Sequence, residues 1–297
     1  MDEKEDILFT VGIVGLGVLG TAIRETFESF PNAFIKCYDK YKKQGINTNN
    51  TTYCNTLKNL LDCNVIFLCL PTLFDNEKKE YNKKEIYNVC DDLAIYKYKG
   101  IIILKSTVEP KTTENISKKY KAIYPQFNIV HSPEFLSEKT ATEDFKTQKN
   151  IIIGIVDTDI VNTNEFVNNN KYNTVSYLLD TFEYFFQKSK ISFCSSNESE
   201  SMKIFCNSFY ASKIQIFTEY KLLCDKMNID YNNVKDLMLS NNWINPMHTQ
   251  VPGHDGKISF GGNCFPKDIN ALNEVFKKMN ITNKVISSVI EEHNEMR

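Results

Sequence analysis

One cysteine near the end of the chain has neighbours that suit a nucleophile. The stretch SFGGNCFPKD places Cys264 after a glycine pair and just before Pro266 and Lys267, a pattern typical of a first helical turn. A thiol at a helix N-terminus beside a lysine ionises more readily, and the thiolate attacks carbonyl carbons. Asp268, one turn further on, is suited to position or deprotonate a water molecule. The same spacing fits a buried structural cysteine equally well.

A lysine and an asparagine lie one turn apart on a predicted long helix. Residues 197–227 contain neither Gly nor Pro, so we expect one helix of about thirty residues there, capped by Asn197 or Ser199. Lys203 and Asn207 share one face of this helix. In a cleft, a cation and an amide can hold a developing oxyanion. On a solvent-exposed helix the same pair has no chemical role.

The N-terminal region carries a dinucleotide-binding fingerprint. VGIVGLGVLG has G-x-G-x-x-G spacing between a predicted strand and a predicted helix. This arrangement provides a tight turn, a close approach of backbone to pyrophosphate, and a helix N-terminus that faces the phosphates. We therefore expect the cofactor loop to comprise Gly15, Leu16, Gly17, Val18, Leu19 and Gly20.

Three strand ends add candidate ligand contacts. Asp39 ends the second predicted strand, where a carboxylate accepts hydrogen bonds from ribose hydroxyls and repels a 2′-phosphate, so we expect NAD rather than NADP. Lys40 weakens that preference. Thr72 and Thr107 also end strands, and in an open α/β sheet the carboxyl ends of strands border the ligand crevice. Both threonines fit turn capping equally well.

An acidic block, SPEFLSEKTATEDF, follows another predicted strand. It carries Glu134 and Glu138 four residues apart. Their spacing alone fits a solvated helix face as well as a functional pair.

The predicted elements form an α/β protein. Continuous apolar strands separated by helices indicate a Rossmann-like, doubly wound parallel sheet covered on both faces. The second half of the chain is mostly helical, with a loop over 241–263 and helices from Phe265 and over 283–297. Residues 157–172 interrupt the pattern as a surface excursion. We expect strands within 10–17, 34–40, 65–71, 101–107, 128–134, 150–156 and 191–195, and a helix over 177–186.

Composition excludes several classes of function. The chain has 297 residues, a formal charge of −2 and 42% apolar residues, which is typical of a soluble two-domain protein. This charge offers no footprint for nucleic acid, the apolar runs are too short to span a bilayer, and the acidic N-terminus does not resemble a signal peptide. The nine cysteines form no metal-binding pattern. We therefore expect a cytoplasmic protein with no metal, membrane or nucleic-acid partner.

Together these segments resemble the UDP-glucose/GDP-mannose dehydrogenase family. The matching blocks include GIVGLGVLG, FLCLPT, LKSTVEPKTT, SPEFLSEKTATEDF and FGGNCFPKDINAL, in family order, and PEFL and GGNCFPKD are the most specific. Members oxidise the C6 alcohol of a nucleotide sugar to a carboxylate with two NAD. The resemblance is closest to members that convert UDP-glucose to UDP-glucuronate, so it implies that substrate.

The resemblance also implies roles for single residues. Cys264 resembles the nucleophile that forms a thiohemiacetal and then a thioester, and Lys203 and Asn207 resemble the oxyanion-stabilising pair. It implies water handling and proton transfer by Asp268, Glu138 and Thr107. It implies NAD contacts from Asp39, Thr72, Thr107, Glu138 and Lys267. It implies substrate contacts from Glu134, Phe135, Leu136, Lys203, Asn207 and the loop from Gly253 to Gly261.

The resemblance further implies two domains and a dimer. We expect a NAD-binding domain over 1–195 and a helical central domain over 196–297, which carries Cys264 and forms a homodimer through the long helix. The chain ends near the point where the family's C-terminal domain begins, and a separate chain is one possible source of that domain. Two other readings stay open. A β-hydroxyacid dehydrogenase has a similar fold with Lys and Asn but needs no cysteine, and a truncated NAD-binding relative would be non-catalytic.

Overall fold

A computed structural model describes residues 9–41, 45–156 and 172–297. The predicted surface excursion therefore lies outside the described residues, except for its last residue, Tyr172. The chain forms two compact units. The first contains the residues up to Thr72 and Asn82–Ser201, and the second contains Leu73–Tyr81 and Met202–Arg297. A short segment of the N-terminal half thus belongs to the helical unit.

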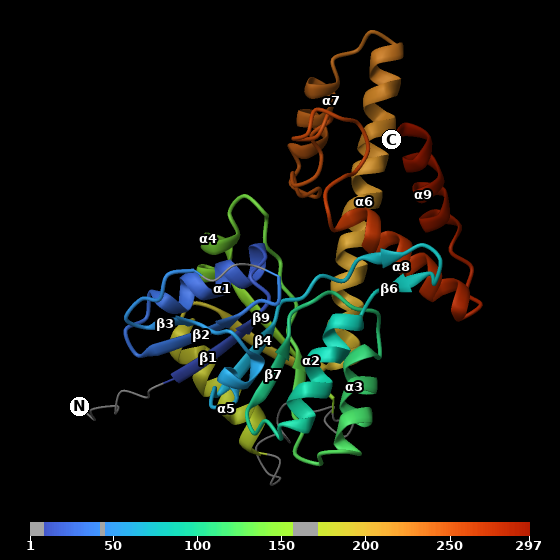
Figure 1. The fold of residues 1–297 in the computed structure, drawn as a ribbon. Helices are drawn as coiled ribbons and strands as arrows, with labels where there is room; N and C mark the ends of the chain where they lie inside the picture. The colour runs from blue at the N-terminus through green and yellow to red at the C-terminus, as the bar shows by residue number, and fades with distance from the viewer. Residues whose placement is uncertain (1–8, 42–44, 157–171) are drawn as a thin grey trace. The chain divides into compact units, whose positions relative to one another are not determined.

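The first unit is built on one eight-stranded sheet with the order β10-β9-β8-β7-β4-β1-β2-β3 (Figure 1). The six neighbouring strands β8, β7, β4, β1, β2 and β3 of this sheet are parallel, which confirms the predicted Rossmann-like sheet. β9 runs antiparallel to β8, and β10 is parallel to β9. The strands are β1 (Phe9–Val14), β2 (Ala33–Tyr38), β3 (Thr51–Tyr53), β4 (Val65–Leu68), β7 (Ile101–Leu104), β8 (Ile129–His131), β9 (Asn150–Ile155) and β10 (Lys190–Ser195).

Helices cover both faces of this sheet because its central strands are apolar on both faces. In β7, Ile101 and Ile103 join a core with α1 and α5, whereas Ile102 and Leu104 join a second core with α2 and α3. α2 and α3 lie side by side, and α1 packs against α4 (Figure 1). The helices of this unit are α1 (Val18–Glu28), the short 3₁₀ helix η1 (Leu57–Leu60), α2 (Lys84–Ile95), α3 (Thr112–Lys121), α4 (Ala141–Lys146) and α5 (Tyr172–Phe185).

The predicted long helix is α6, which spans Ser196–Lys226 and contains 31 residues. The predicted caps at Asn197 and Ser199 are wrong, because Ser195 and Glu198 form a capping box ahead of them. The Ser195 hydroxyl accepts from the Glu198 N–H at 3.2 Å, and the Glu198 carboxylate accepts from the Ser195 N–H at 2.8 Å. Glu200, in the second turn, is buried and accepts hydrogen bonds from Thr113 at the start of α3.

The second unit combines most of α6 with three further helices and a small hairpin. α8 begins at Phe265 and α9 begins directly after Asn283, as predicted, and residues 241–263, all of them described, contain neither helix nor strand. The hairpin of β5 and β6 was not predicted from the sequence. The elements are α7 (Tyr231–Leu239), α8 (Phe265–Lys278), α9 (Lys284–Met296), β5 (Phe74–Asp75) and β6 (Glu80–Tyr81). Within the described ranges, no helix has the length and apolar character that crossing a bilayer requires.

Candidate active site

The three fingerprint glycines meet three different spatial demands. Gly15 has φ +92°, and a Cβ there would lie 2.5 Å from the Cys69 carbonyl oxygen. A Cβ on Gly20 would lie 1.9 Å from the Gly15 carbonyl oxygen, so this glycine allows α1 to pack on the loop. A Cβ on Gly17 would meet no described atom within 4 Å. The loop is therefore tightly packed at Gly15 and Gly20, and it leaves open space at Gly17 beside the uncapped N–H groups of α1. This open space fits a dinucleotide phosphate.

Asp39 is held next to this loop. Its carboxylate accepts hydrogen bonds from the Leu16 N–H at 2.7 Å and from the Tyr41 N–H at 2.9 Å. The neighbouring Lys40 lies 3.4 Å from Glu85, an acidic residue of α2 that balances part of its charge. The predicted ribose acceptor and the predicted phosphate loop are thus in direct contact.

Thr72 and Thr107 also meet at the carboxyl edge of the sheet. The Thr72 hydroxyl donates to the Thr107 carbonyl oxygen at 2.7 Å, and both residues are buried. Ser106 makes a second link, because its hydroxyl donates to the Leu70 carbonyl and accepts from the Leu70 N–H. Hydrogen bonds therefore join the segments that follow β4 and β7, where the sequence predicts ligand contacts.

A buried lysine that we did not predict lies at the same edge. The ammonium of Lys105, which is 4% exposed, donates to the Ser132 hydroxyl at 3.3 Å and to the Pro133 carbonyl at 3.2 Å. It therefore fixes the start of the segment that carries Glu134. The sequence signal for this residue was a lysine that directly follows the apolar strand IIIL and precedes Ser-Thr.

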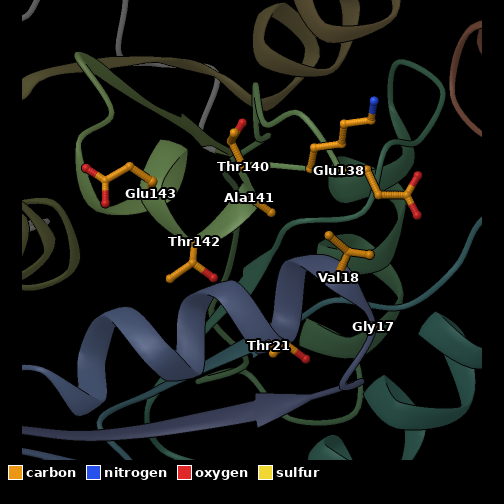
Figure 2. Close-up of a pocket in the computed structure, with 9 residues that line it drawn as sticks. Gly17, Val18, Thr21, Glu138, Thr140, Ala141, Thr142 and Glu143 are labelled. Atoms are coloured by element: carbon orange, nitrogen blue, oxygen red, sulfur yellow. The ribbon is translucent and has the colours of Figure 1, made fainter. Parts of the chain in front are cut away.

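The acidic block forms one wall of a cavity of about 580 Å³ (Figure 2). Residues 132–140 run as loop and turn before α4, so the solvated-helix-face interpretation of Glu134 and Glu138 is wrong. Glu134 accepts a hydrogen bond from the Leu136 N–H at 2.6 Å, and Phe135 is exposed. Figure 2 shows the side chains of the block across from the start of α1. The cavity is lined by Gly17, Val18, Thr21, Glu138, Lys139, Thr140, Ala141, Thr142 and Glu143.

In the second unit, Asp268 is the centre of a buried polar cluster. Its side chain is fully buried, and one carboxylate oxygen accepts from the Tyr81 hydroxyl and from the Lys267 ammonium, each at 2.5 Å. The other oxygen accepts from the Asn207 side-chain amide, also at 2.5 Å. Two predicted site residues, Asn207 and Asp268, are therefore in contact. Tyr81 is a partner that the sequence does not single out.

Lys203 and Asn207 are buried together on α6, at 4% and 6% exposure. The alternative of a solvent-exposed pair is therefore wrong. α6 and α8 pack side by side in this unit, since Ile204 lies in one cluster with Leu272 and Ala211 in another with Ile269. The predicted oxyanion face of α6 is thus turned toward the helix that carries Asp268.

Cys264 directly precedes α8 at its N-cap position and is exposed to solvent. All nine cysteines fall within the described residues, and Cys264 alone is exposed. Burial raises the pKa of Cys37, Cys63 and Cys69 to about 12, as expected for unreactive thiols. The buried-structural-cysteine interpretation of Cys264 is therefore wrong. The charge of Lys267 is balanced by Asp268, and the N-terminus of α8 gives a positive potential at Cys264.

The loop before Cys264 is held by Arg297, a residue that the sequence did not single out. Its guanidinium donates to the Ile258 carbonyl at 2.9 Å, to the Ser259 carbonyl at 3.1 Å and to the Asp255 carboxylate at 2.7 Å. A Cβ on Gly261 would lie 2.6 Å from this guanidinium, which explains the glycine there. Gly253, at the other end of the loop, donates from its N–H to the Lys257 carbonyl at 2.9 Å.

The predicted residues thus form two groups, one in each unit. Residues suited to hold a dinucleotide gather in the first unit, and residues suited to attack a carbonyl carbon gather in the second. The first group is Gly15, Leu16, Gly17, Val18, Leu19, Gly20, Asp39, Lys40, Thr72, Thr107, Glu134, Phe135, Leu136 and Glu138; the second is Lys203, Asn207, Gly253, Gly261, Cys264, Lys267 and Asp268.

Both halves of the chain match domains of one protein family. Residues 36–170 match the NAD binding domain of the UDP-glucose/GDP-mannose dehydrogenase family, and residues 197–295 match its central domain. The UDP-glucose 6-dehydrogenase of Rickettsia typhi is 31% identical over 272 residues, which are 87% of this chain and 56% of that protein. That of Campylobacter jejuni is 27% identical and covers 88% of this chain and 60% of that protein. The chain spans about half the length of the curated relatives it matches.

Solved structures share the fold at low identity. A UDP-glucose dehydrogenase from Pyrobaculum islandicum is similar with a TM-score of 0.80 and 19% identity, over 98% of this chain and 70% of that one. A 3-hydroxyisobutyrate dehydrogenase from Mycobacterium tuberculosis is similar with a TM-score of 0.69 and 12% identity, over 97% of this chain and 94% of that one. At these identities the likeness concerns the fold alone.

Proposed function

Since this chain belongs to the UDP-glucose/GDP-mannose dehydrogenase family, we propose that it oxidises the C6 alcohol of a nucleotide sugar, UDP-glucose, to the carboxylate with NAD. One observation carries the proposal. An exposed thiol, Cys264, stands at a helix N-terminus one turn before the buried pair of Asp268 and Asn207. A dehydrogenase that forms only a carbonyl product needs no such thiol.

NAD fits the first unit. The open side of Gly17 and the N-terminus of α1 suit its pyrophosphate, and Asp39 suits the adenosine ribose. Thr72, Thr107 and Glu138 complete the proposed cofactor site, and Lys267 is a further proposed NAD contact. When bound, NAD supplies a hydride acceptor for each of the two oxidations.

The residues of the second unit supply the covalent steps. The Cys264 thiolate adds to the C6 carbonyl carbon of the aldehyde and forms a C–S bond, which gives a thiohemiacetal and, after the second oxidation, a thioester. Lys203 and Asn207 donate to the oxygen that carries negative charge in these steps. Water then attacks the thioester carbon, Asp268 takes up its proton, and the C–S bond breaks to release the acid and the thiolate.

We further propose that the remaining predicted contacts bind the substrate. Glu134, Phe135 and Leu136 lie in the segment fixed by Lys105, and the loop from Gly253 to Gly261 is fixed by Arg297. Backbone groups on such fastened loops can bind a sugar with little loss of conformational entropy. In this proposal the NAD-binding domain comprises residues 1–195 and the helical central domain comprises residues 196–297. The proposed location of the protein is the cytoplasm.

The surface of α6 supports the proposal that the chain forms a homodimer. Exposed apolar side chains recur along this helix at spacings of three, four and seven residues, so they share one face. Such a contiguous apolar stripe typically marks a protein–protein interface. The exposed residues of this face are Phe205, Phe209, Ile216, Tyr220 and Leu223, and Met227 directly after the helix continues it. Because the chain spans about half the length of its relatives, a second chain that supplies further substrate contacts is also compatible with this proposal.

A β-hydroxyacid dehydrogenase is the second candidate. This chain covers 94% of the length of the 3-hydroxyisobutyrate dehydrogenase structure, but only 70% of the length of the UDP-glucose dehydrogenase structure from Pyrobaculum islandicum. Chain length therefore favours the second candidate. The exposed Cys264 favours the first candidate.

The test is NADH formation on addition of UDP-glucose to the purified chain. We expect two NADH per sugar for the wild type and no acid release for Cys264→Ser. Cys90→Ser is a suitable control, because Cys90 is buried on α2. If the chain binds NAD and stays silent at saturating UDP-glucose, or reduces NAD with a hydroxyacid and retains this activity as Cys264→Ser, the proposal fails.

A further inference from the structure

Tyr81 connects the small hairpin of the second unit to the proposed catalytic carboxylate. β6 ends at Tyr81 and lies beside α8 (Figure 1). The Tyr81 side chain is 1% exposed, and its hydroxyl donates to Asp268, 187 residues further along the chain, at 2.5 Å. The Lys267 ammonium lies 4.7 Å from the centre of the Tyr81 ring. Tyr81 thus contacts both members of the ion pair between Lys267 and Asp268.

Packing alone does not require a tyrosine at this position. The ring lies in an apolar cluster with Ile204, Ala271 and Leu272, where a phenylalanine would fill the same space. A buried hydroxyl that loses its partner costs about 1–3 kcal/mol, so a tyrosine here depends on the carboxylate. The hydroxyl therefore matches the Asp268 carboxylate, whereas the apolar packing needs only the ring.

Three donors from three elements hold the Asp268 carboxylate. They are the Tyr81 hydroxyl on β6, the Lys267 ammonium on α8 and the Asn207 side-chain amide on α6. A carboxylate accepts hydrogen bonds at about four lone-pair sites, so three donors leave one site for a water molecule. They also fix the plane of the carboxylate, because donors hold both of its oxygens.

We propose that Tyr81 is a positioning residue that keeps the Asp268 carboxylate oriented to accept the proton of the hydrolytic water. The inference rests on the proposed function, in which a thioester at Cys264 is hydrolysed. Water oxygen forms a bond to the acyl carbon, the C–S bond breaks with its electron pair on sulfur, and one water proton passes to Asp268. The step is neither an oxidation nor a reduction. Tyr81 touches no reacting atom and acts through the carboxylate.

The test compares Tyr81→Phe with a matched control, Tyr98→Phe. Tyr98 is also buried, and its hydroxyl donates to a backbone carbonyl, that of Cys63, at 3.0 Å. We expect Tyr81→Phe to hydrolyse the thioester about tenfold more slowly, the effect of one charge-assisted hydrogen bond. The acyl-enzyme should then accumulate on Cys264, as detected by intact mass after rapid quenching. Tyr98→Phe should change neither the hydrolysis rate nor the amount of acyl-enzyme.

A second measurement keeps the outcome independent of turnover. Infrared difference spectra of the substrate-free chain, with Asp268→Asn as the reference, report the carboxylate stretching bands of Asp268. We expect these bands to shift in Tyr81→Phe, because the carboxylate loses one hydrogen bond. A wild type without activity overturns the proposed function, while the spectra still test the link between Tyr81 and Asp268. Unchanged carboxylate bands, or equal effects of Tyr81→Phe and Tyr98→Phe on hydrolysis, overturn the inference.

Discussion

The Glu200 carboxylate accepts two hydrogen bonds from Thr113, one from the backbone N–H at 2.7 Å and one from the hydroxyl at 2.6 Å. Both residues are buried, and burial raises the pKa of Glu200 to about 7 from an ordinary value of 4.5. The folded chain therefore holds a proton on this carboxyl more tightly than the unfolded chain. The resulting stabilisation is complete below pH 4.5 and is lost as the pH rises toward 7.

Glu200→Gln removes this titration and keeps the size of the side chain. Relative to the variant, the unfolding free energy of the wild type should fall by about 2–3 kcal/mol between pH 5 and pH 8, measured by urea denaturation. Glu198→Gln is the control, because hydrogen bonds from the Ser195 backbone and side chain lower the pKa of Glu198, so its effect should be flat over this range. A pH-independent difference for Glu200→Gln would show that its carboxyl does not titrate there.

Gly17 and Gly20 should respond differently to alanine. In Gly20→Ala the new Cβ would lie 1.9 Å from the Gly15 carbonyl oxygen, so we expect a loss of about 2 kcal/mol or more in stability. In Gly17→Ala the methyl group points into open space, so stability should change by less than about 0.5 kcal/mol. NADH affinity should nevertheless fall about tenfold in Gly17→Ala, because the methyl occupies the side that the pyrophosphate approaches. Unchanged NADH fluorescence titration for Gly17→Ala would contradict this placement.

Asp39→Asn tests the choice of cofactor. The amide oxygen can still accept from the Leu16 N–H, but the charge that repels a 2′-phosphate is removed. We expect the ratio of NADPH to NADH affinity to rise about tenfold, a difference of about 1.4 kcal/mol. Asp62→Asn is a charge-matched control, since Asp62 pairs with Lys36 on the surface of the same unit. Equal ratios in both variants would mean that Asp39 does not contact the ribose.

Much of the first unit could be predicted because its strands are apolar on both faces. The direction of β9 and β10 could not, since an apolar run does not encode whether a strand is parallel or antiparallel to its neighbour. The two-residue strands of the hairpin are too short to give a periodic pattern, so Tyr81 was not recognised.

In the candidate site, local chemistry was informative and long-range pairing was not. Cys264, Lys203 and Asn207 were identified from their immediate neighbours and helical spacing, together with the family resemblance. The hydrogen bond between Tyr81 and Asp268 joins residues 187 positions apart, and only the fold reveals such a pair.

The apolar stripe on α6 predicts that one charge will change the oligomeric state. Phe209 lies within the stripe, and a glutamate there would place an unpaired charge in the proposed dimer interface. We expect Phe209→Glu to weaken the dimer at least about 100-fold, measured by sedimentation equilibrium. Ile95→Glu changes an equally exposed apolar residue of α2 and should leave the dimer intact. A wild type that is monomeric at high concentration would contradict the dimer itself.

Arg297 predicts a difference between two substitutions that both remove its guanidinium. A planar guanidinium can donate to three acceptors of the loop at once, whereas the single ammonium of a lysine cannot reproduce this fork. Arg297→Lys should therefore behave more like Arg297→Met than like wild type. In both, hydrogen exchange over residues 255–261 should accelerate about tenfold, and KM for the nucleotide sugar should rise more than KM for NAD. Arg24→Met, which removes exposed or half-buried ion pairs on α1, should leave this loop protected. Wild-type exchange in Arg297→Met would mean that the loop is held by its other contacts, such as the hydrogen bond from the Ser259 hydroxyl to Gln215.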